Sequence, residues 1–214
     1  NYEKGKELNL VGIVENKSLK ILSISQRYTN HNLSFGIAFK HIYPIKLDKK
    51  KTKKIYDISF KIIKNLKIEN SVVYFQFINQ KNNIKIIEIA IRTPGGLMYE
   101  LSKYISGYDI IKFTILKSLG INNALEYSNS KSKKYNHLII KFFTEFDFKK
   151  SKDIQKIKSN KFKKLPGFLN LVMYKRKLQK LRNSSGRIGA IIITGKNKKL
   201  CQDNLNRSLD KIYK

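Results

Sequence analysis

Several residue types that would point to particular classes of protein are scarce in this sequence. Its 214 residues include one cysteine, three prolines and no tryptophan. The single cysteine, Cys201, cannot form an internal disulfide or a thiolate metal cluster, and the three histidines are too scattered for a histidine-rich metal site. No run approaches 18 apolar residues, which excludes a membrane-spanning helix, and the first residues lack a signal-peptide pattern. We therefore expect a reducing, cytoplasmic setting.

Acidic residues are also scarce, since 15 of them face 45 lysines and arginines and leave a net charge of +30. Such a charge is typical of nucleic-acid binding. Only six of the basic residues are arginine, however, and Arg is preferred for bidentate recognition of phosphates and bases. Lys, Ile and Asn supply 90 of the 214 residues, as an AT-rich coding sequence would favour. We therefore expect no nucleic-acid partner unless lysines and exposed aromatic side chains converge on one face.

A polar segment, residues 126–136, divides the sequence into a first part, 1–125, and a second part, 126–214. Two hairpin patterns and three helices are expected in the first part. They cover residues 7–14 with 19–25, 72–78 with 84–92, and helices over 48–66, 97–105 and 109–119. The second part predicts strands near 138–143, 165–174 and 187–194, then a closing helix over 197–213. Together these elements indicate an α+β fold.

The later strand of the second hairpin carries the strongest candidates for functional residues. Strict alternation over residues 84–92 places the even-numbered side chains, Glu88 and Arg92 among them, on one face, and Gln76 joins them if the hairpin keeps parity. A carboxylate can hold Mg²⁺ and an Arg can hold phosphoryl oxygens. The Gly95–Gly96 turn brings backbone N–H groups to a helix start. These parts describe a site for a metal-bound phosphate; the alternative is a Glu88–Arg92 ion pair beside an ordinary turn.

The same segment resembles a known family. IIEIAIRTPGG (86–96) and the two helices after it look like the C-terminal lobe of ATP-grasp ligases, where the pattern is Glu-x-Asn-x-Arg-x-x-Gly-Gly. The segments at 5–29, 39–47 and 72–77 are similar to the strands and the His-x-x-Pro segment that precede it, so the resemblance covers residues 1 to about 124. SSGRIGAIII (184–193) more loosely resembles the family's small C-terminal domain. The implied fold is a lobe of largely antiparallel sheet with helices packed on it, followed by a small α+β domain.

The resemblance implies an enzyme that uses ATP and Mg²⁺ to join a small-molecule carboxylate to an amine through an acyl phosphate. Glu88 falls at the family's metal-binding Glu, and Arg92 at the Arg that contacts the transferred phosphoryl group. The Gly95–Gly96 turn falls near the substrate carboxylate. Arg27 lies where many members have a basic residue of the nucleotide site, and Gln76 lies where they have a first metal-binding Glu. No membrane partner is implied, and a homodimer is compatible with the resemblance.

The sequence departs from the family at two of these positions. Gln76 lacks the charge of the expected Glu, and Ala90 replaces a metal-binding Asn. The sequence also contains no GxxxxGK[ST] and no GxGxxG. We therefore expect the C-terminal portion of a longer ligase, inactive without an N-terminal lobe that carries a nucleotide loop. A non-catalytic relative and a basic nucleic-acid-binding module stay open as alternatives. His41 and Cys201 are expected to be structural.

Overall fold

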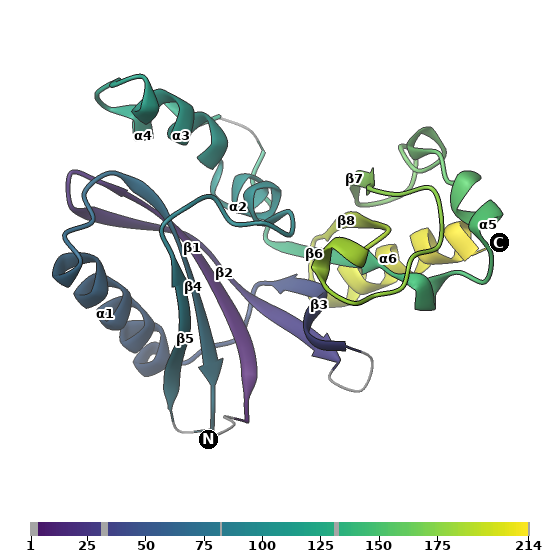
Figure 1. The fold of residues 1–214 in the computed structure, drawn as a ribbon, viewed down its shortest axis with the longest axis horizontal. Coiled ribbons are helices and arrows are strands. Elements are labelled where there is room, and N and C mark those ends of the chain that lie inside the picture. Colours follow the sequence, from purple (N-terminus) through teal and green to yellow (C-terminus); the bar gives the residue numbers. More distant parts are fainter. Residues whose placement is uncertain (1–3, 31–33, 82, 131–132, 214) are drawn as a thin grey trace. The chain divides into compact units, whose positions relative to one another are not determined.

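The computed structural model describes residues 4–30, 34–81, 83–130 and 133–213. The chain divides into two compact units (Figure 1). Unit 1 comprises residues 1–26 and 44–134, and unit 2 comprises residues 27–43 and 135–214. The polar segment expected at 126–136 contains the boundary at 134/135. Residues 27–43 belong with unit 2 although they precede that segment.

Unit 1 is built on four strands in the order β5-β4-β1-β2. Its elements are β1 (Lys6–Glu15), β2 (Ser18–Asn30, whose end lies in unit 2), α1 (Lys49–Asn65), β4 (Ser71–Asn79), β5 (Ile84–Ala90), α2 (Met98–Ser106), α3 (Ile110–Ser118) and α4 (Ala124–Tyr127). Both expected hairpins and all three expected helices are confirmed within a few residues of their predicted ends.

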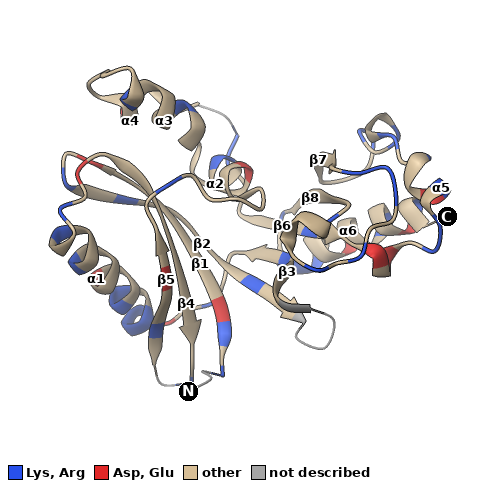
Figure 2. Cartoon of the chain, in the orientation of Figure 1, with Lys and Arg blue, Asp and Glu red and all other residues tan. Residues whose placement is uncertain are grey.

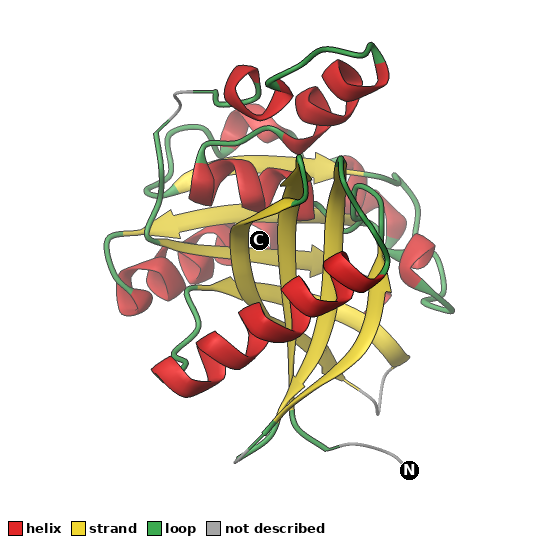
Figure 3. Ribbon diagram, turned by 90° about the vertical axis from the view of Figure 1, so that its left-hand side faces the viewer, coloured by secondary structure: helices red, strands yellow, loops and turns green. Residues whose placement is uncertain are grey.

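One face of this sheet is covered by α1, which runs diagonally across the strands (Figure 3). Alternate side chains of β1 and β4, including Leu10, Phe75 and Phe77, are fully buried and pack in one core with Ile55 and Ile63 of the helix. Because strand side chains alternate between faces, the residues between these apolar positions lie on the opposite face. Sequence alternation in β1 and β4 therefore fixes which polar side chains α1 leaves uncovered.

Unit 2 contains four strands in the order β3-β6-β8-β7, and β6 pairs antiparallel with β3 and β8, as β7 does with β8. Its elements are β3 (Ser34–Tyr43), β6 (His137–Phe143), η1 (Glu145–Asp147), α5 (Ser151–Gln155), η2 (Ser159–Lys161), β7 (Phe168–Met173), η3 (Ser184–Gly186), β8 (Gly189–Gly195) and α6 (Lys198–Tyr213). Helix α6 packs on the sheet through Cys201, Leu205 and Ile212. The expected α+β fold is confirmed, with β3 as an additional strand. Among the described residues, no helix has both the length and the apolar character that a bilayer crossing requires.

Candidate functional site

Three polar side chains form a row across unit 1, on the face that α1 leaves uncovered. Asn9 of β1 pairs with Gln76 of β4, and Gln76 pairs with Glu88 of β5. Residues paired in this way project from the same side of a sheet. Helix α2 covers the Asn9 end of the row, where Met98 contacts the Asn9 amide, whereas the Glu88 side chain is exposed. The sequence prediction that Gln76 and Glu88 share a face is confirmed.

The alternation predicted along β5 is wrong on the N-terminal side of Glu88. Ile86 pairs with Phe77 of the core-facing set, and the pairing then shifts so that Glu88 meets Gln76. Ile87 is the extra residue of a β-bulge, a feature that reverses the parity of a strand. Without this bulge Glu88 would pair with Phe75 of the core-facing set, and the carboxylate would face the α1 side. The bulge therefore places the carboxylate opposite the amide.

Hydrogen bonds orient the Gln76 amide. Its Nε2 donates to the Tyr74 hydroxyl at 2.9 Å, and that hydroxyl donates to Oδ1 of Asn9 at 2.9 Å. The Gln76 amide oxygen is therefore the atom left to accept a hydrogen bond or to ligate a cation. No cluster of three or more His, Cys, Asp or Glu exists within the described ranges. One carboxylate and one amide oxygen fit Mg²⁺, which takes few protein ligands when phosphates and waters complete its octahedron.

Arg92 lies beyond the end of β5, and its guanidinium donates to the carbonyl of Thr93 at 3.1 Å. It lines a cavity of about 520 Å³ together with Asn70, Thr114 and Lys117. Residues 86–89 of the edge strand β5, Glu88 among them, line a different cleft with the C-terminal end of α1 at the edge of the sheet. The structure thus places Glu88 beside Gln76 but does not bring Glu88 and Arg92 to one cavity. Glu88 and Arg92 form no ion pair, so the structural alternative raised by the sequence is wrong.

The Gly95–Gly96 turn leads directly into α2. Gly96 and Leu97 have φ values of 64° and 59°, and Leu97 is an N-cap without a side-chain hydrogen bond. The first N–H groups of α2 are therefore not satisfied by a capping side chain, and they suit an anion. A Cβ on Gly95 would meet no atom within 4 Å, so the backbone there is open to a ligand.

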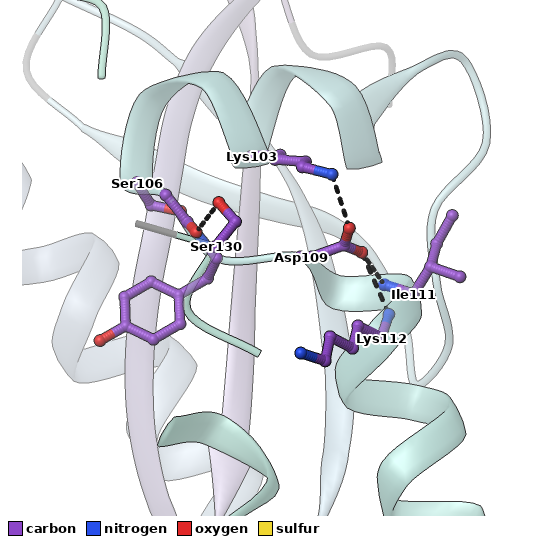
Figure 4. A network of polar contacts seen from close by, with 8 residues as sticks. Lys103, Ser106, Asp109, Ile111, Lys112 and Ser130 are labelled. Atoms are coloured by element: carbon purple, nitrogen blue, oxygen red, sulfur yellow. Dashed lines mark hydrogen bonds and ion pairs between the residues drawn. The ribbon is translucent and has the colours of Figure 1, made fainter. Parts of the chain in front are cut away.

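A polar network joins α2 to α3, the helix that lines the Arg92 cavity (Figure 4). Asp109 caps α3 by accepting the backbone N–H groups of Ile111 and Lys112, and its carboxylate pairs with Lys103 of α2 at 2.8 Å. Burial opposes ionisation of Asp109, but the hydrogen bonds from Lys103 and the backbone outweigh it and lower the pKa of the carboxyl group. The Ser130 hydroxyl donates to the carbonyl of Gly107, the residue that ends α2, at 2.6 Å.

Arg27 and His41 lie in unit 2, where the charges of Arg27 and Arg187 both act on the His41 imidazole. The Arg187 guanidinium lies 4.0 Å from the centre of the Phe142 ring and donates to the Ala38 carbonyl at 2.9 Å, and Arg27 donates to the Gly36 carbonyl. Burial, followed by the charges of Arg27 and Arg187, lowers the pKa of His41 to about 3, so the imidazole is neutral near pH 7. Sequence reasoning treated Arg187 as the start of a strand within the segment 184–193 that loosely resembles the family's C-terminal domain, and assigned it no role in a site.

Comparison with known proteins gives a fold and no assignment from sequence. No protein-family model and no curated protein matches the sequence. Among solved structures, L-amino acid ligase from Bacillus licheniformis aligns with a TM-score of 0.74 at 15% identity, over 100% of this chain and 55% of that one. Phosphoribosylglycinamide synthetase from Anaerococcus prevotii gives 0.72 at 18% identity, over 98% and 53%.

A third solved structure, a biotin carboxylase complex from Campylobacter jejuni, aligns with a TM-score of 0.66 at 18% identity, over 98% of this chain and 46% of that one. These three proteins are ATP-grasp ligases, and the chain spans about half the length of each. The chain therefore has the ATP-grasp fold that its sequence resembles.

Proposed function

We propose that this chain forms the metal- and phosphate-contacting part of an ATP-dependent ligase that joins a carboxylate to an amine. The observation that carries the proposal is the pairing of Glu88 with Gln76 on the uncovered face of the unit 1 sheet. The fold supports it, because ATP-grasp ligases supply nucleotide chemistry from this kind of sheet. The substrates of the whole protein are part of the proposal, and a second lobe that holds the nucleotide from the other side is implied.

Glu88 and Gln76 would hold Mg²⁺, with the carboxylate supplying the charge and the amide oxygen the second protein ligand. Bound Mg²⁺ would neutralise the phosphates of ATP and polarise the γ-phosphoryl group toward a carboxylate substrate. Tyr74 keeps the Gln76 oxygen available by accepting the amide N–H group. Because Mg²⁺ draws most of its ligands from phosphate and water, one carboxylate is a workable protein contribution.

Arg92 and the start of α2 would bind the anionic groups. The Arg92 side chain makes one hydrogen bond, to a carbonyl, which leaves most of its five N–H donors for a phosphoryl or carboxylate oxygen. The uncapped N–H groups after the Gly95–Gly96 turn add a second anion-binding element. Together they would stabilise negative charge as an acyl phosphate forms and as an amine displaces its phosphate.

Trapping with hydroxylamine tests this mechanism directly. The full-length protein is incubated with Mg-ATP, hydroxylamine and a panel of amino-acid and other small carboxylates, and the hydroxamates formed are measured by mass spectrometry. Phosphorylation of the carboxylate by ATP releases ADP, and hydroxylamine then displaces inorganic phosphate from the acyl phosphate to give the hydroxamate. We expect hydroxamate from at least one carboxylate class, with a loss of about a hundredfold or more in Glu88→Gln and in Arg92→Gln.

Matched charge changes control for unspecific effects. Glu126→Gln and Arg207→Gln alter exposed residues outside the proposed site and should leave the rate unchanged. ATP binding without hydroxamate or ADP formation would favour a non-catalytic relative, a reading to which Gln76 and Ala90 lend support. Equal activity of wild type and Glu88→Gln would show that the metal site has been assigned to the wrong residues.

A further inference from the structure

The side of α1 that faces solvent carries a pair of exposed aromatic rings. Tyr56 and Phe60 lie one helical turn apart and are 44% and 40% exposed. They lie outside the apolar face of α1, whose residues Ile55 and Ile63 are buried against the sheet. Their ring planes are parallel within 4°, with centroids 6.1 Å apart. Two parallel, solvent-accessible rings form a surface on which flat, uncharged groups can stack.

Lysines flank this pair along the same side of the helix. With 100° per residue, Lys49, Lys53 and Lys64 fall within a narrow sector that also contains both rings. All three are exposed, and none forms an ion pair within the described ranges. Lysines on the opposite flank behave differently, since Lys51 and Lys54 donate to the β4–β5 connection at Gln80 and Asn83. Figure 2 shows basic residues along α1, with a single acidic residue, Asp57, within the helix.

We propose that this face of α1, defined by Lys49, Lys53, Tyr56, Phe60 and Lys64, binds single-stranded nucleic acid. Phosphates would contact the three ammonium groups, and unpaired bases would stack on the two rings. The face thus meets the condition that the overall composition alone does not, namely lysines and exposed aromatic side chains on one surface.

The three exposed lysines favour a polyanionic partner, and the two parallel exposed rings favour one with flat bases. An anionic membrane would also attract the lysines, but a helix lying in a bilayer surface needs a wide apolar face to insert. The apolar face of α1 is used by the sheet of unit 1, which leaves two aromatic rings as the apolar part of the exposed side. Coding bias accounts for the number of lysines; it does not account for a stacked, exposed aromatic pair between them.

Fluorescence anisotropy with the full-length protein tests the proposal. The probes are fluorescein-labelled 12-nucleotide oligo(U) and oligo(dT), titrated at several salt concentrations. We expect Lys49→Gln/Lys53→Gln/Lys64→Gln to reduce the slope of log affinity against log salt by about 2, since each phosphate contact on a single strand contributes about 0.7. Tyr56→Ala/Phe60→Ala should weaken binding by about tenfold or more with little change in that slope.

The control variants test whether binding depends on where the lysines lie or only on the total positive charge. Lys158→Gln/Lys163→Gln/Lys164→Gln removes three exposed lysines of unit 2, so equal effects of the two triple variants would overturn the proposal. Tyr56→Leu/Phe60→Leu keeps apolar bulk without stacking faces and should weaken binding as the alanine pair does; unchanged affinity would also overturn it. Binding to phosphatidylserine vesicles without binding to either oligonucleotide would assign the face to membranes instead.

Discussion

Gln76 of β4 lies directly opposite Glu88 of β5, and the amide and the carboxylate project from the same uncovered face of the sheet. The resemblance of the sequence to ATP-grasp ligases implies a carboxylate at the position of Gln76. The Tyr74 hydroxyl holds the Gln76 N–H group, so the amide offers oxygen without charge. A metal bound here would therefore be held by one charged protein ligand.

Replacing Gln76 by Glu should strengthen this site. We expect Gln76→Glu to bind Mg²⁺ in the presence of ATP about tenfold more tightly, because affinity for hard cations rises with the number of charged ligands. Isothermal titration calorimetry of the full-length protein measures the change. The double variant Gln76→Glu/Glu88→Gln restores the original charge and should return the affinity toward wild type. No gain in Gln76→Glu would mean that the cation is held elsewhere.

The Asp109 cap should make the stability of unit 1 depend on pH. Its hydrogen bonds lower the pKa of the carboxyl in the folded state, so the stabilisation is present above the unfolded value near 3.9 and is lost as pH falls through the folded value. Asp109→Ala should cost about 1 kcal/mol at pH 7 through loss of the cap. Urea unfolding at pH 7 and pH 3 measures both effects. Asp109→Asn retains a capping oxygen, so at pH 7 it should lose less stability than Asp109→Ala.

His41 should make unit 2 less stable in mild acid. Its pKa is lowered to about 3 in the folded state by burial and by the nearby Arg27 and Arg187, whereas the unfolded value is near 6.5. The unfolded state then binds more protons between these values, and stability falls as pH decreases from 6.5 toward 3. At pH 5 the loss is about 2 kcal/mol. Urea unfolding of wild type and His41→Gln at pH 7.5 and pH 5 isolates this contribution, and an identical pH dependence in both would contradict it.

Local signals in the sequence were enough to predict α1, α2 and α3 of unit 1, but not the short helix α4. Asp48 and Asp109 are capping residues at the predicted starts of α1 and α3, and Gly107 ends α2 with a φ of 83°. Strand β3 was missed because its pairing with β6 is a long-range contact without a local turn signal. Arg187 was missed for the same reason, since the Phe142 ring and the Ala38 carbonyl that hold it are distant in sequence.

The candidate site was predictable in part. Parity along β4 was enough to place Gln76 on the uncovered face, and Glu88 was placed on the same face although the bulge at Ile87 was not foreseen. A strict alternation along β5 does not allow for an extra, bulged residue such as Ile87, so Ile84 and Ile86 were assigned to the wrong face. The separation of Glu88 from Arg92 follows from the end of β5 at Ala90, which no residue type in that segment marks.

Gly195 should tolerate no side chain, because the start of α6 lies against it. A Cβ at this position would lie 2.6 Å from the Cα of Cys201 and 2.9 Å from its Cβ, so β8 and α6 would have to separate. Overpacking at a backbone contact costs about 3 kcal/mol, which we expect for Gly195→Ala in urea unfolding followed by circular dichroism. Gly95→Ala is the matched control, since its Cβ would meet nothing within 4 Å and its φ is not positive. Similar stability losses in the two variants would show that the close approach of α6 to β8 is not what requires glycine at 195.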